Sequence, residues 1–519
     1  MRDRAEGFSI QDVLAGASVA LVLIPQSVAY AELAGLPAQV GLYAGAVPPI
    51  AAAFFASSPY LQTGPGAPTA LLTLGALVPL AARGTPDYIA LAALLALIVG
   101  VVRLLVGVLK AGGIAFLLSQ PVLMAFTTGA AVLIVASQIP GALGVTGAPA
   151  GGVLAQAAWA VGHPGAWEIS SLVLAAGTVV VVLGARRIHP LVPGILLAAA
   201  VGIGWSVLSG YAGPVVGEVP RGLPHLSLAF PWRAVPALVV PGVVIALVGF
   251  AEATSIARTF AAQDRAPWDP DREFVGQGLA NVASAVTGGF PVGGSFGRST
   301  VARLSGARTR WSGAVAGVLG LAFLPFAWVL APLPRAVLAA IVIAAVSSLV
   351  KVRPLLKLWH QSRPQALVAY TTVALALLLA PRIDQAVLVG VVLSLSVHAW
   401  REMKPRVETW TAGDTLHVRP EGVLWFGSAH VVEHALMDIL GKDDRPTRVA
   451  LHLGALGRID LSGALGLQQL VDTAKLAGVT VEFVDVPAHA ERILKSVLGW
   501  ECPGAGAPGP PPTAPPAPS

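Results

Sequence analysis

Residues 19–31 read VALVLIPQSVAYA, an apolar run with Pro25 and Gln26 at its centre. Two further stretches combine apolar residues with clusters of glycine and proline: TGPGAPT at 63–69 and GGFPVGGSFGR at 288–298. Interrupted membrane helices with polar groups at mid-membrane depth are costly, and proteins keep them mainly where backbone faces a substrate. The three stretches therefore predict broken or kinked membrane helices around a transport site.

The composition indicates a membrane protein. The 519 residues are 55% hydrophobic and only 12% charged, with a mean hydropathy of +0.74. A soluble globular chain carries about 25% charged residues. The first apolar run starts near Ile10 without a small-residue cleavage site, so we expect a retained helix rather than a signal peptide. The single cysteine, Cys502, excludes an intramolecular disulfide and a cysteine-cluster metal site.

The net charge of +6 admits two interpretations. One is nucleic-acid binding. The other, which we favour, is that basic residues in short loops between apolar spans set the membrane orientation. We therefore expect membrane lipid, and no nucleic acid, among the partners.

About fourteen apolar segments precede residue 400 at the spanning length of about 20 residues. The expected spans are 12–33, 37–56, 66–82, 88–110, 114–138, 168–185, 190–210, 236–262, 274–290, 297–305, 311–332, 334–350, 364–381 and 383–400. The third and tenth are short and follow the glycine/proline clusters. They are third in each set of seven, which predicts two inverted seven-helix repeats, about 10–210 and 236–400.

Basic residues support an even number of spans with a cytoplasmic N-terminus. The loops after even-numbered spans hold Lys110, Arg186, Arg187, Arg265, Arg272, Arg303, Arg308, Arg310, Lys351, Arg353, Lys357, Arg401, Lys404 and Arg406. The opposite loops hold only Arg83, Arg221, Arg233, Arg335 and Arg382.

The pattern becomes that of a soluble α/β domain after residue 403. We expect strands at 416–418, 423–426, 448–453 and 479–484, and helices at 430–440, 462–476 and 488–498. The predicted domains are thus a transmembrane region at 1–403, a cytoplasmic domain at 404–502 and a disordered Pro/Ala/Gly-rich tail at 503–519.

Three blocks of sequence, in order, resemble the sulfate permease (SulP) family of anion transporters with a C-terminal STAS domain. The first comprises Asp12-Val-Leu-Ala-Gly16, Leu23-Ile-Pro-Gln26, Tyr30, Leu33-Ala-Gly-Leu-Pro37, Gly41-Leu-Tyr43 and Gly64-Pro65. The second comprises 252–257, Gly276-Gln-Gly-Leu-Ala-Asn281, Gly288-Gly-Phe-Pro291, Gly294-Ser-Phe-Gly-Arg298 and Gly306-Ala-Arg308, and the third is Arg458-Ile-Asp-Leu-Ser-Gly463.

The resemblance covers about residues 12–498 and implies a core domain from spans 1–4 and 8–11. It implies a gate domain from spans 5–7 and 12–14, homodimers, and elevator-like alternating access. Together with the distribution of basic residues, it leads us to expect a multi-pass protein of the bacterial cytoplasmic (inner) membrane, with its N-terminus and STAS domain in the cytoplasm. No metal-ligand cluster, phosphate loop or nucleophile motif stands out, so we expect neither an enzyme nor a cofactor.

The proposed substrate site lies between two half-helix N-termini. Each would present unpaired N–H groups and about half a positive charge, which together can bind an anion. The residues concerned are Ala67 and Thr69 in one half-helix, and Phe296, Gly297 and Arg298 in the other. The alternative is that glycine and proline here only permit close helix packing.

Gln26 and Tyr30 are one helical turn apart and share a face. In the family pattern these positions contact the anion by hydrogen bonds, whereas the alternative role is interhelical packing. Arg298 either adds positive charge to the site or bridges to Glu252. Many family members carry a hydroxyl residue where this chain has Gly297, which leaves backbone N–H groups as the expected donors there.

Glu252 lies inside the eighth span, where a charged carboxylate is costly and repels an anion. Protonation would then favour anion binding, which gives a basis for H⁺/anion symport; a permanent pair with Arg298 is the alternative. Sodium coupling is less favoured, although Thr254, Ser255 and Ser295 could supply oxygen ligands.

Other polar residues have structural interpretations. We expect Arg103 to snorkel or to pair structurally, and His360 and His398 to lie at the interface. Ser462 is expected to cap a helix.

We therefore predict a secondary active transporter of small anions (sulfate, bicarbonate or a C4-dicarboxylate), coupled to protons. The alternatives are a sodium-coupled symporter, an anion exchanger, a channel-like pathway, a nucleobase permease on a similar fold, and a signalling protein whose STAS-like domain senses membrane occupancy.

Overall fold

The computed structural model describes residues 8–116, 119–147, 149, 151–189, 191–220, 222–404, 406–425, 428, 431–432, 434 and 446–499. The chain divides into two compact units, Met1–Ser394 and Leu395–Ser519. The predicted tail at 503–519, Cys502 and most of the helix expected at 430–440 lie outside the described residues.

Helices make up nearly all of the first unit. In chain order they are α1 (Ile10–Leu33), α2 (Ala38–Phe55), α3 (Ala67–Leu77), α4 (Pro86–Val108), α5 (Gln120–Ala142), α6 (Val153–Gly162), α7 (Ile169–Ile188), α8 (Gly194–Ser209), α9 (Val235–Asp264), α10 (Pro270–Val286), α11 (Phe296–Leu304), α12 (Trp311–Phe323), α13 (Arg335–Val346), α14 (Val352–Gln361), α15 (Arg363–Leu378) and α16 (Ile383–Glu402), which runs on into the second unit. Two short strands, β1 (Thr63–Gly64) and β2 (Gly293–Gly294), precede α3 and α11.

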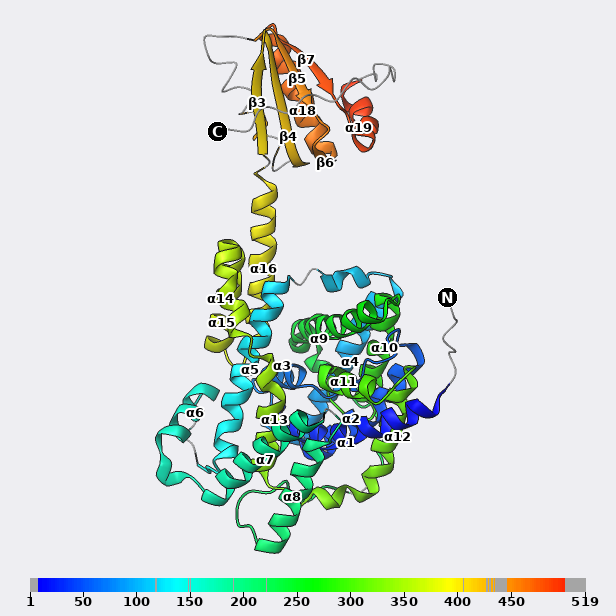
Figure 1. The fold of residues 1–519 in the computed structure, drawn as a ribbon, viewed down its shortest axis with the longest axis vertical. Helices are drawn as coiled ribbons and strands as arrows, with labels where there is room; N and C mark the ends of the chain where they lie inside the picture. The colour runs from blue at the N-terminus through cyan, green and yellow to red at the C-terminus, as the bar shows by residue number, and fades with distance from the viewer. Residues whose placement is uncertain are drawn as a thin grey trace. The chain divides into compact units, whose positions relative to one another are not determined.

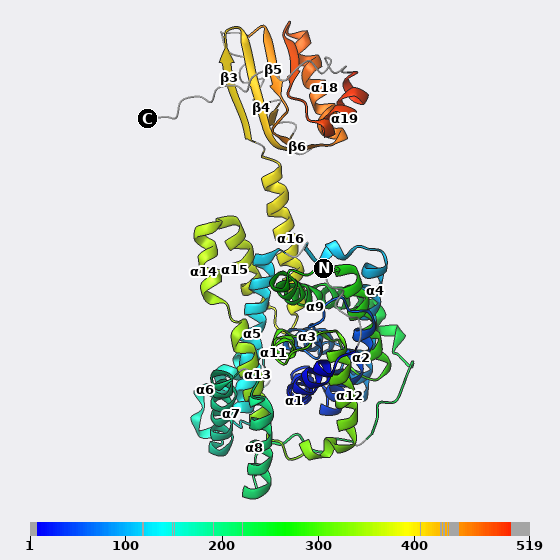
Figure 2. The same cartoon turned by 45° about the vertical axis from the view of Figure 1, so that its right-hand side comes forward.

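The helices of the first unit form two groups. In both views α1–α4 lie together with α9–α12, while α5, α7, α13 and α15 lie beside them (Figures 1 and 2). Within the first group α4 and α2 both pack on α10, and α12 packs on α1 and α2. Within the second, α5 packs on α13 and α15, and α7 packs on α13. Helices far apart in sequence are therefore neighbours within each group.

The expected short spans coincide with α3 and α11, but α1 runs unbroken through Pro25. Proline removes one helical hydrogen bond, and a helix packed inside a bundle can tolerate this loss. By length and composition, seven helices of the described chain could cross a membrane, and five further apolar helices are shorter. Helices α6 and α14, of ten residues each, were not expected, because neither is long enough to span a membrane and neither follows one of the two glycine/proline clusters, at 63–69 and 288–298, from which the short spans were expected.

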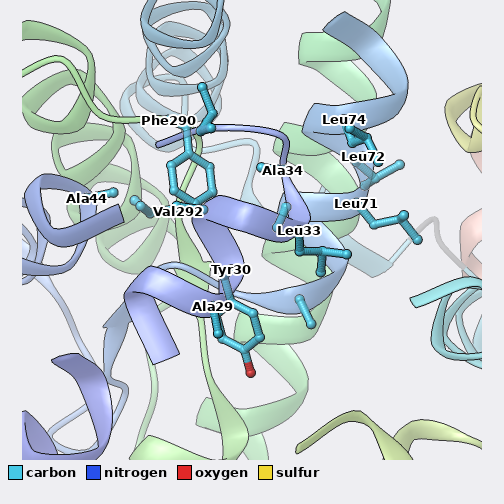
Figure 3. Packing of buried hydrophobic residues seen from close by; sticks show 14 of the residues in the cluster. Ala29, Tyr30, Leu33, Ala34, Ala44, Leu71, Leu72, Leu74, Phe290 and Val292 are labelled. Carbon is cyan, nitrogen blue, oxygen red and sulfur yellow. The ribbon is translucent and has the colours of Figure 1, made fainter. Parts of the chain in front are cut away.

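A large apolar core contains the buried side chains of α3, whereas Ala302 of α11 belongs to a second cluster with Leu23 and Phe250. Buried side chains of α1, α2, α4 and α9 join the large core, together with Phe290 and Val292 before β2. Figure 3 shows Tyr30 of α1 in this cluster, with its hydroxyl directed away from Phe290 and Val292. Close packing on several sides holds the backbone of α1, α3 and α9 in place, and these helices carry the polar residues described below.

The second unit is a mixed sheet with helices. Its described elements are β3 (Arg406–Ala412), β4 (Thr415–Leu424), β5 (Arg448–His452), β6 (Leu456–Ile459), α18 (Leu461–Leu476), β7 (Thr480–Val484) and α19 (Ala488–Leu498). The strand order is β3-β4-β5-β7, with β6 paired to β4; β3 and β4 are antiparallel and the other pairs are parallel. Leu416, Val418, Val449 and Leu451 meet Leu467 and other residues of α18 in a separate core.

The structure of this unit differs from the expectations in four respects. The strands predicted at 416–418 and 423–426 belong to one strand, β4, which ends at Leu424, and β3 and β6 were not expected. Ser462 does not cap α18; Asp460 is the N-cap, and its carboxylate accepts a hydrogen bond from Gly463 N at 2.7 Å. Aspartate is at least as good an N-cap as serine, and here its backbone is extended while Ser462 is already helical.

Two histidines pair on the face of this sheet opposite the core. His417 Nδ1 lies 2.9 Å from His452 Nε2, and the Trp410 ring stacks on both imidazoles. Asp485 lies 3.6 Å from the other nitrogen of His452. Burial, and then the positive charge of His452, lower the pKa of His417.

Candidate functional site

Strands β1 and β2 tie the two half-helices together. Thr63 pairs with Gly294 and Gly64 with Gly293 in an antiparallel bridge, and Ser295 N donates to Gln62 O at 3.1 Å. Helix α3 begins within three residues of β1, and α11 begins within two residues of β2. Two segments about 230 residues apart in sequence thus form one compact backbone unit.

Neither half-helix has a side-chain cap. The N-cap residues are Gly66 for α3 and Ser295 for α11, and neither accepts a side-chain hydrogen bond from the first turn. The first N–H groups of a helix have no partner within it, so these two termini keep donors available. The positive ends of the helix dipoles accompany them.

Glycine permits the close approach at the bridge. A Cβ added at Gly64, where φ is +152°, would lie 3.2 Å from Arg298 Nη2. A Cβ at Gly294 would lie 2.8 Å from the Leu61 side chain and 3.2 Å from Ala253 Cα. Side chains at these positions would push the bridge away from Arg298 or from α9.

Arg298 is the cation of this site. Its side chain is 1% exposed, and Nη1 donates to Gln26 Oε1 at 3.2 Å. Its Nε and Nη2 are buried and have no hydrogen-bond partner among the described residues. A buried cation with two unused donors is costly, because each unsatisfied donor loses its hydration. An anion bound here would satisfy both donors.

The other predicted residues lie around this guanidinium. Gln26 and Tyr30 are buried on α1, Tyr30 lies near enough to Arg298 to interact with it electrostatically, and the charge of Glu252 acts on Arg298. Ala67 and Thr69 are buried in the first turn of α3. The structure therefore brings all of these residues, together with Arg298, into one region of the first helix group.

Phe296 and Gly297 occupy the exposed side of the first turn of α11. The Phe296 ring stacks on Phe260 at a centroid distance of 6.0 Å. No heavy atom lies within 4 Å of a Cβ added at Gly297. Backbone N–H groups are thus what these two residues can offer a ligand, as the sequence suggested for Gly297.

Glu252 lies on α9, directly before Ala253, which borders the bridge at Gly294. Its charge interacts with that of Arg298. Among the three hydroxyls considered for sodium, Thr254 is buried and its Oγ1 has no partner in the described chain, whereas Ser255 is exposed. This geometry leaves both proton and sodium coupling open.

Arg103 pairs structurally, which is one of the two roles expected for it, and it does not snorkel. It is fully buried and donates to the carbonyls of Val292 at 2.8 Å, Ala246 at 3.1 Å and Ile245 at 3.3 Å. It therefore joins α4 and α9 to the segment before β2. Gly249 leaves room for it, because a Cβ there would lie 2.6 Å from Arg103 Nη2.

Two amides of α10 also position the bridge. Asn281 donates to Val292 O at 3.0 Å and accepts from Val292 N at 2.9 Å. Gln277 Nε2 donates to Thr63 Oγ1 at 2.7 Å. Their spacing of four residues in an apolar span was a usable signal, since it places both amides on one helix face.

Within the described parts of the chain, no group of three histidine, cysteine or acidic residues could hold a metal ion. The groups gathered around the bridge are hydrogen-bond donors and the Arg298 guanidinium, with the Glu252 carboxylate nearby. Such a site suits a small anion.

Models of two protein families match the chain: the sulfate permease family over residues 10–372 and the STAS domain over residues 406–497. A chloroplastic sulfate transporter 4.1 of Arabidopsis thaliana is 29% identical over 501 residues, covering 89% of this chain and 73% of that protein. A probable sulfate transporter of Mycobacterium tuberculosis is 34% identical over 376 residues, covering 70% of this chain and 66% of that protein.

Solved structures have the same fold. The murine anion transporter Slc26a9 in its inward-facing state gives a TM-score of 0.87 at 19% identity, covering 96% of this chain and 88% of that one. The transmembrane domain of the cyanobacterial bicarbonate transporter BicA gives 0.65 at 25% identity, covering 72% of this chain and 96% of that one.

Proposed function

The chain belongs to the sulfate permease family, as a multi-pass membrane transporter with a STAS domain, and from this premise we propose that it moves a small oxyanion or carboxylate by proton-coupled symport. Sulfate, bicarbonate and C4-dicarboxylates are the candidate substrates. Relatives named as sulfate transporters and a fold neighbour named as a bicarbonate transporter support the first two.

The observation that carries the proposal is the unsatisfied guanidinium beside two uncapped half-helices. Arg298 Nε and Nη2 have no partner in the described chain, and the bridge ties the first turns of α3 and α11 together. Backbone donors and a fork of guanidinium donors match the oxygens of a planar or tetrahedral anion. The binding residues in this proposal are Gln26, Tyr30, Ala67, Thr69, Phe296, Gly297 and Arg298, with Phe296 and Gly297 acting through backbone N–H.

Glu252 is the proposed proton-coupling residue. Its charge acts on Arg298, so the ionised carboxylate weakens the positive field that attracts the anion. Protonation removes that competition, and the anion and the proton then favour each other's binding. This reciprocal coupling is what symport requires.

The proposed conformational cycle is elevator-like. The group of α1–α4 and α9–α12 would carry the anion past the group of α5, α7, α13 and α15, as core and gate. The pairing of β1 with β2 supports an inverted relation between two seven-span repeats. Each strand directly precedes the third span of its proposed repeat, and the two strands run antiparallel, as two inverted copies would. We further propose a homodimer in the bacterial cytoplasmic membrane with cytoplasmic termini.

Uptake into liposomes tests this function. The purified chain is reconstituted and offered labelled sulfate, bicarbonate, succinate or fumarate, with and without an inward proton gradient. Gradient-driven accumulation of one anion would support symport and identify the substrate class. Anion movement that ignores the proton gradient would overturn proton coupling and favour exchange, sodium coupling or a channel, which a sodium gradient and counterflow then separate.

Glu252→Gln isolates the coupling step. The amide has the size of the protonated acid but cannot ionise, so anion binding should persist while accumulation driven by ΔpH is lost. Continued concentration of the anion by this variant in response to ΔpH would remove Glu252 from its role.

A further inference from the structure

Helix α14 separates basic and apolar residues on different faces. Its sequence is VRPLLKLWHQ, and it lies between α13 and α15. Leu355 and Leu358 pack against Ala125 of α5 and Ala369 of α15, and Tyr370 Oη donates to Leu355 O at 3.2 Å. One side of the helix is thus fixed to the bundle.

Next to the packed side runs an exposed apolar stripe. Val352, Leu356 and Trp359 follow one another at helical spacing and are 52%, 60% and 48% exposed. An exposed apolar stripe on a membrane protein is suited to the acyl chains of lipid. Trp359 also stacks on Tyr370 at a centroid distance of 6.3 Å, and aromatic side chains are common at membrane interfaces.

The remaining face is basic. Arg353, Lys357 and His360 are exposed on α14, Lys351 is its exposed N-cap, and the exposed Arg363 begins α15. The sequence holds no aspartate or glutamate from residue 351 to residue 383. The Arg363 guanidinium lies 6.0 Å from the centre of the Trp359 ring. Within the described residues no carboxylate pairs with these cations. The helix therefore presents positive charge beside an apolar stripe, the pattern of a membrane-surface helix.

We propose that α14 is a binding site for anionic phospholipid. Its basic face contacts the headgroup phosphates, while Val352, Leu356 and Trp359 contact the upper acyl chains. Charge complementarity selects an anionic lipid over a zwitterionic one. The adjoining apolar stripe selects a lipid over a soluble acidic partner, which would leave that stripe in water. The anion-transport site plays no part in this inference, so either can fail without the other.

Brominated lipids test the site through Trp359. The full chain is placed in mixed micelles that contain brominated phosphatidylglycerol or brominated phosphatidylcholine. The fluorescence of Trp359 is isolated as the difference between the wild type and Trp359→Phe. We expect stronger quenching by phosphatidylglycerol, and we expect inorganic phosphate to leave that quenching in place.

A charge-removal variant shows which residues attract the lipid. Lys351→Gln, Arg353→Gln and Lys357→Gln are combined, and the preference for phosphatidylglycerol should fall by about fivefold for each charge removed. The matched control combines Arg272→Gln, Arg308→Gln and Arg401→Gln, which removes the same charge from exposed positions elsewhere and should keep the preference. Lys357→Gln alone serves if the triple variant does not fold.

Three results would overturn the proposal. The triple variant could retain the wild-type lipid preference, or the control could lose it equally, which would make the effect one of net charge. Neither brominated lipid could quench the fluorescence of Trp359, which would mean that another protein surface covers the apolar stripe.

Discussion

One nitrogen of Arg298 donates to Gln26 and two have no partner in the part of the chain that the structure describes, and the nearby Glu252 carries the opposite charge when ionised. The field at the site therefore depends on whether Glu252 is ionised. A neutral Glu252 leaves Arg298 and the two helix ends to attract an anion; an ionised one offsets them. The proposed coupling follows from these two side chains and needs no long-range relay.

Arg298→Lys should lower anion affinity by at least about tenfold, because it keeps the charge but loses the fork of donors, and a charge-assisted hydrogen bond contributes about 1.5–3 kcal/mol. Calorimetry on the purified variant measures this. Arg303→Lys is the control: Arg303 lies on the same half-helix but pairs with Asp264 at 2.8 Å. Equal affinity in the wild type and Arg298→Lys would show that the guanidinium does not contact the anion.

His417 predicts an acid-sensitive STAS domain. Its lowered pKa means that the folded domain binds this proton less readily than the unfolded chain, in which histidine has a pKa near 6.5. Its contribution to stability is therefore complete above about pH 6.5 and is lost as the pH falls below that value.

Hydrogen exchange of β4 in the full chain at pH 7.5 and 5.5, corrected for intrinsic rates, measures this loss. His417→Gln should reduce the difference between the two pH values, and His489→Gln on α19 should leave it in place. An unchanged pH dependence in His417→Gln would contradict the assignment.

At the scale of elements, the site depends on two strands of two residues each. The bridge holds the start of α3 beside the start of α11, while Arg103, Gln277 and Asn281 hold the bridge to α4, α9 and α10. The donors of the site are thus fixed before an anion arrives. Such preorganisation reduces the cost of binding.

Gly64→Ala tests the bridge. The new methyl group would lie 3.2 Å from Arg298 Nη2 and should displace the guanidinium, weakening anion binding about tenfold or more for one lost charge-assisted hydrogen bond. Gly66→Ala is the matched control, since its methyl group would meet only Thr69 Oγ1, at 3.8 Å. Binding assays with thermal-stability measurements distinguish a lost site from a lost fold. Similar affinities in both variants would disprove the close approach.

The sequence predicted the elements that have strong local signals. Glycine and proline clusters marked the starts of α3 and α11, and long apolar runs marked α1, α4 and α9. It could not predict that α1 continues through Pro25, because tertiary packing decides whether a proline breaks a helix. It also missed β3, which is almost wholly exposed and lacks the alternating apolar pattern of a half-buried strand.

For the candidate site, the sequence marked some residues but not the contacts that hold them in place. Gln26, Arg298 and Glu252 stood out because polar side chains are rare in apolar spans. The partners of Arg103 are backbone carbonyls from two other segments, and no sequence pattern marks such acceptors. Asp460 and Ser462 are both good caps, and only the backbone angles distinguish them.

At the scale of the whole molecule, the two units have separate cores. A chain ending at Lys404 should therefore bind anion with wild-type affinity, while expression or regulation of transport declines. Binding and uptake measured on the same preparation separate these effects. Complete loss of binding in a folded truncation would show that the second unit contributes to the site.

The bridge between β1 and β2 also has consequences for inheritance. Residues 63–64 and 293–294 share backbone hydrogen bonds, so the two halves of the chain build the proposed anion cradle jointly. A side chain added at Gly64 or at Gly294 would disturb both segments, so these two positions are expected to remain glycine together.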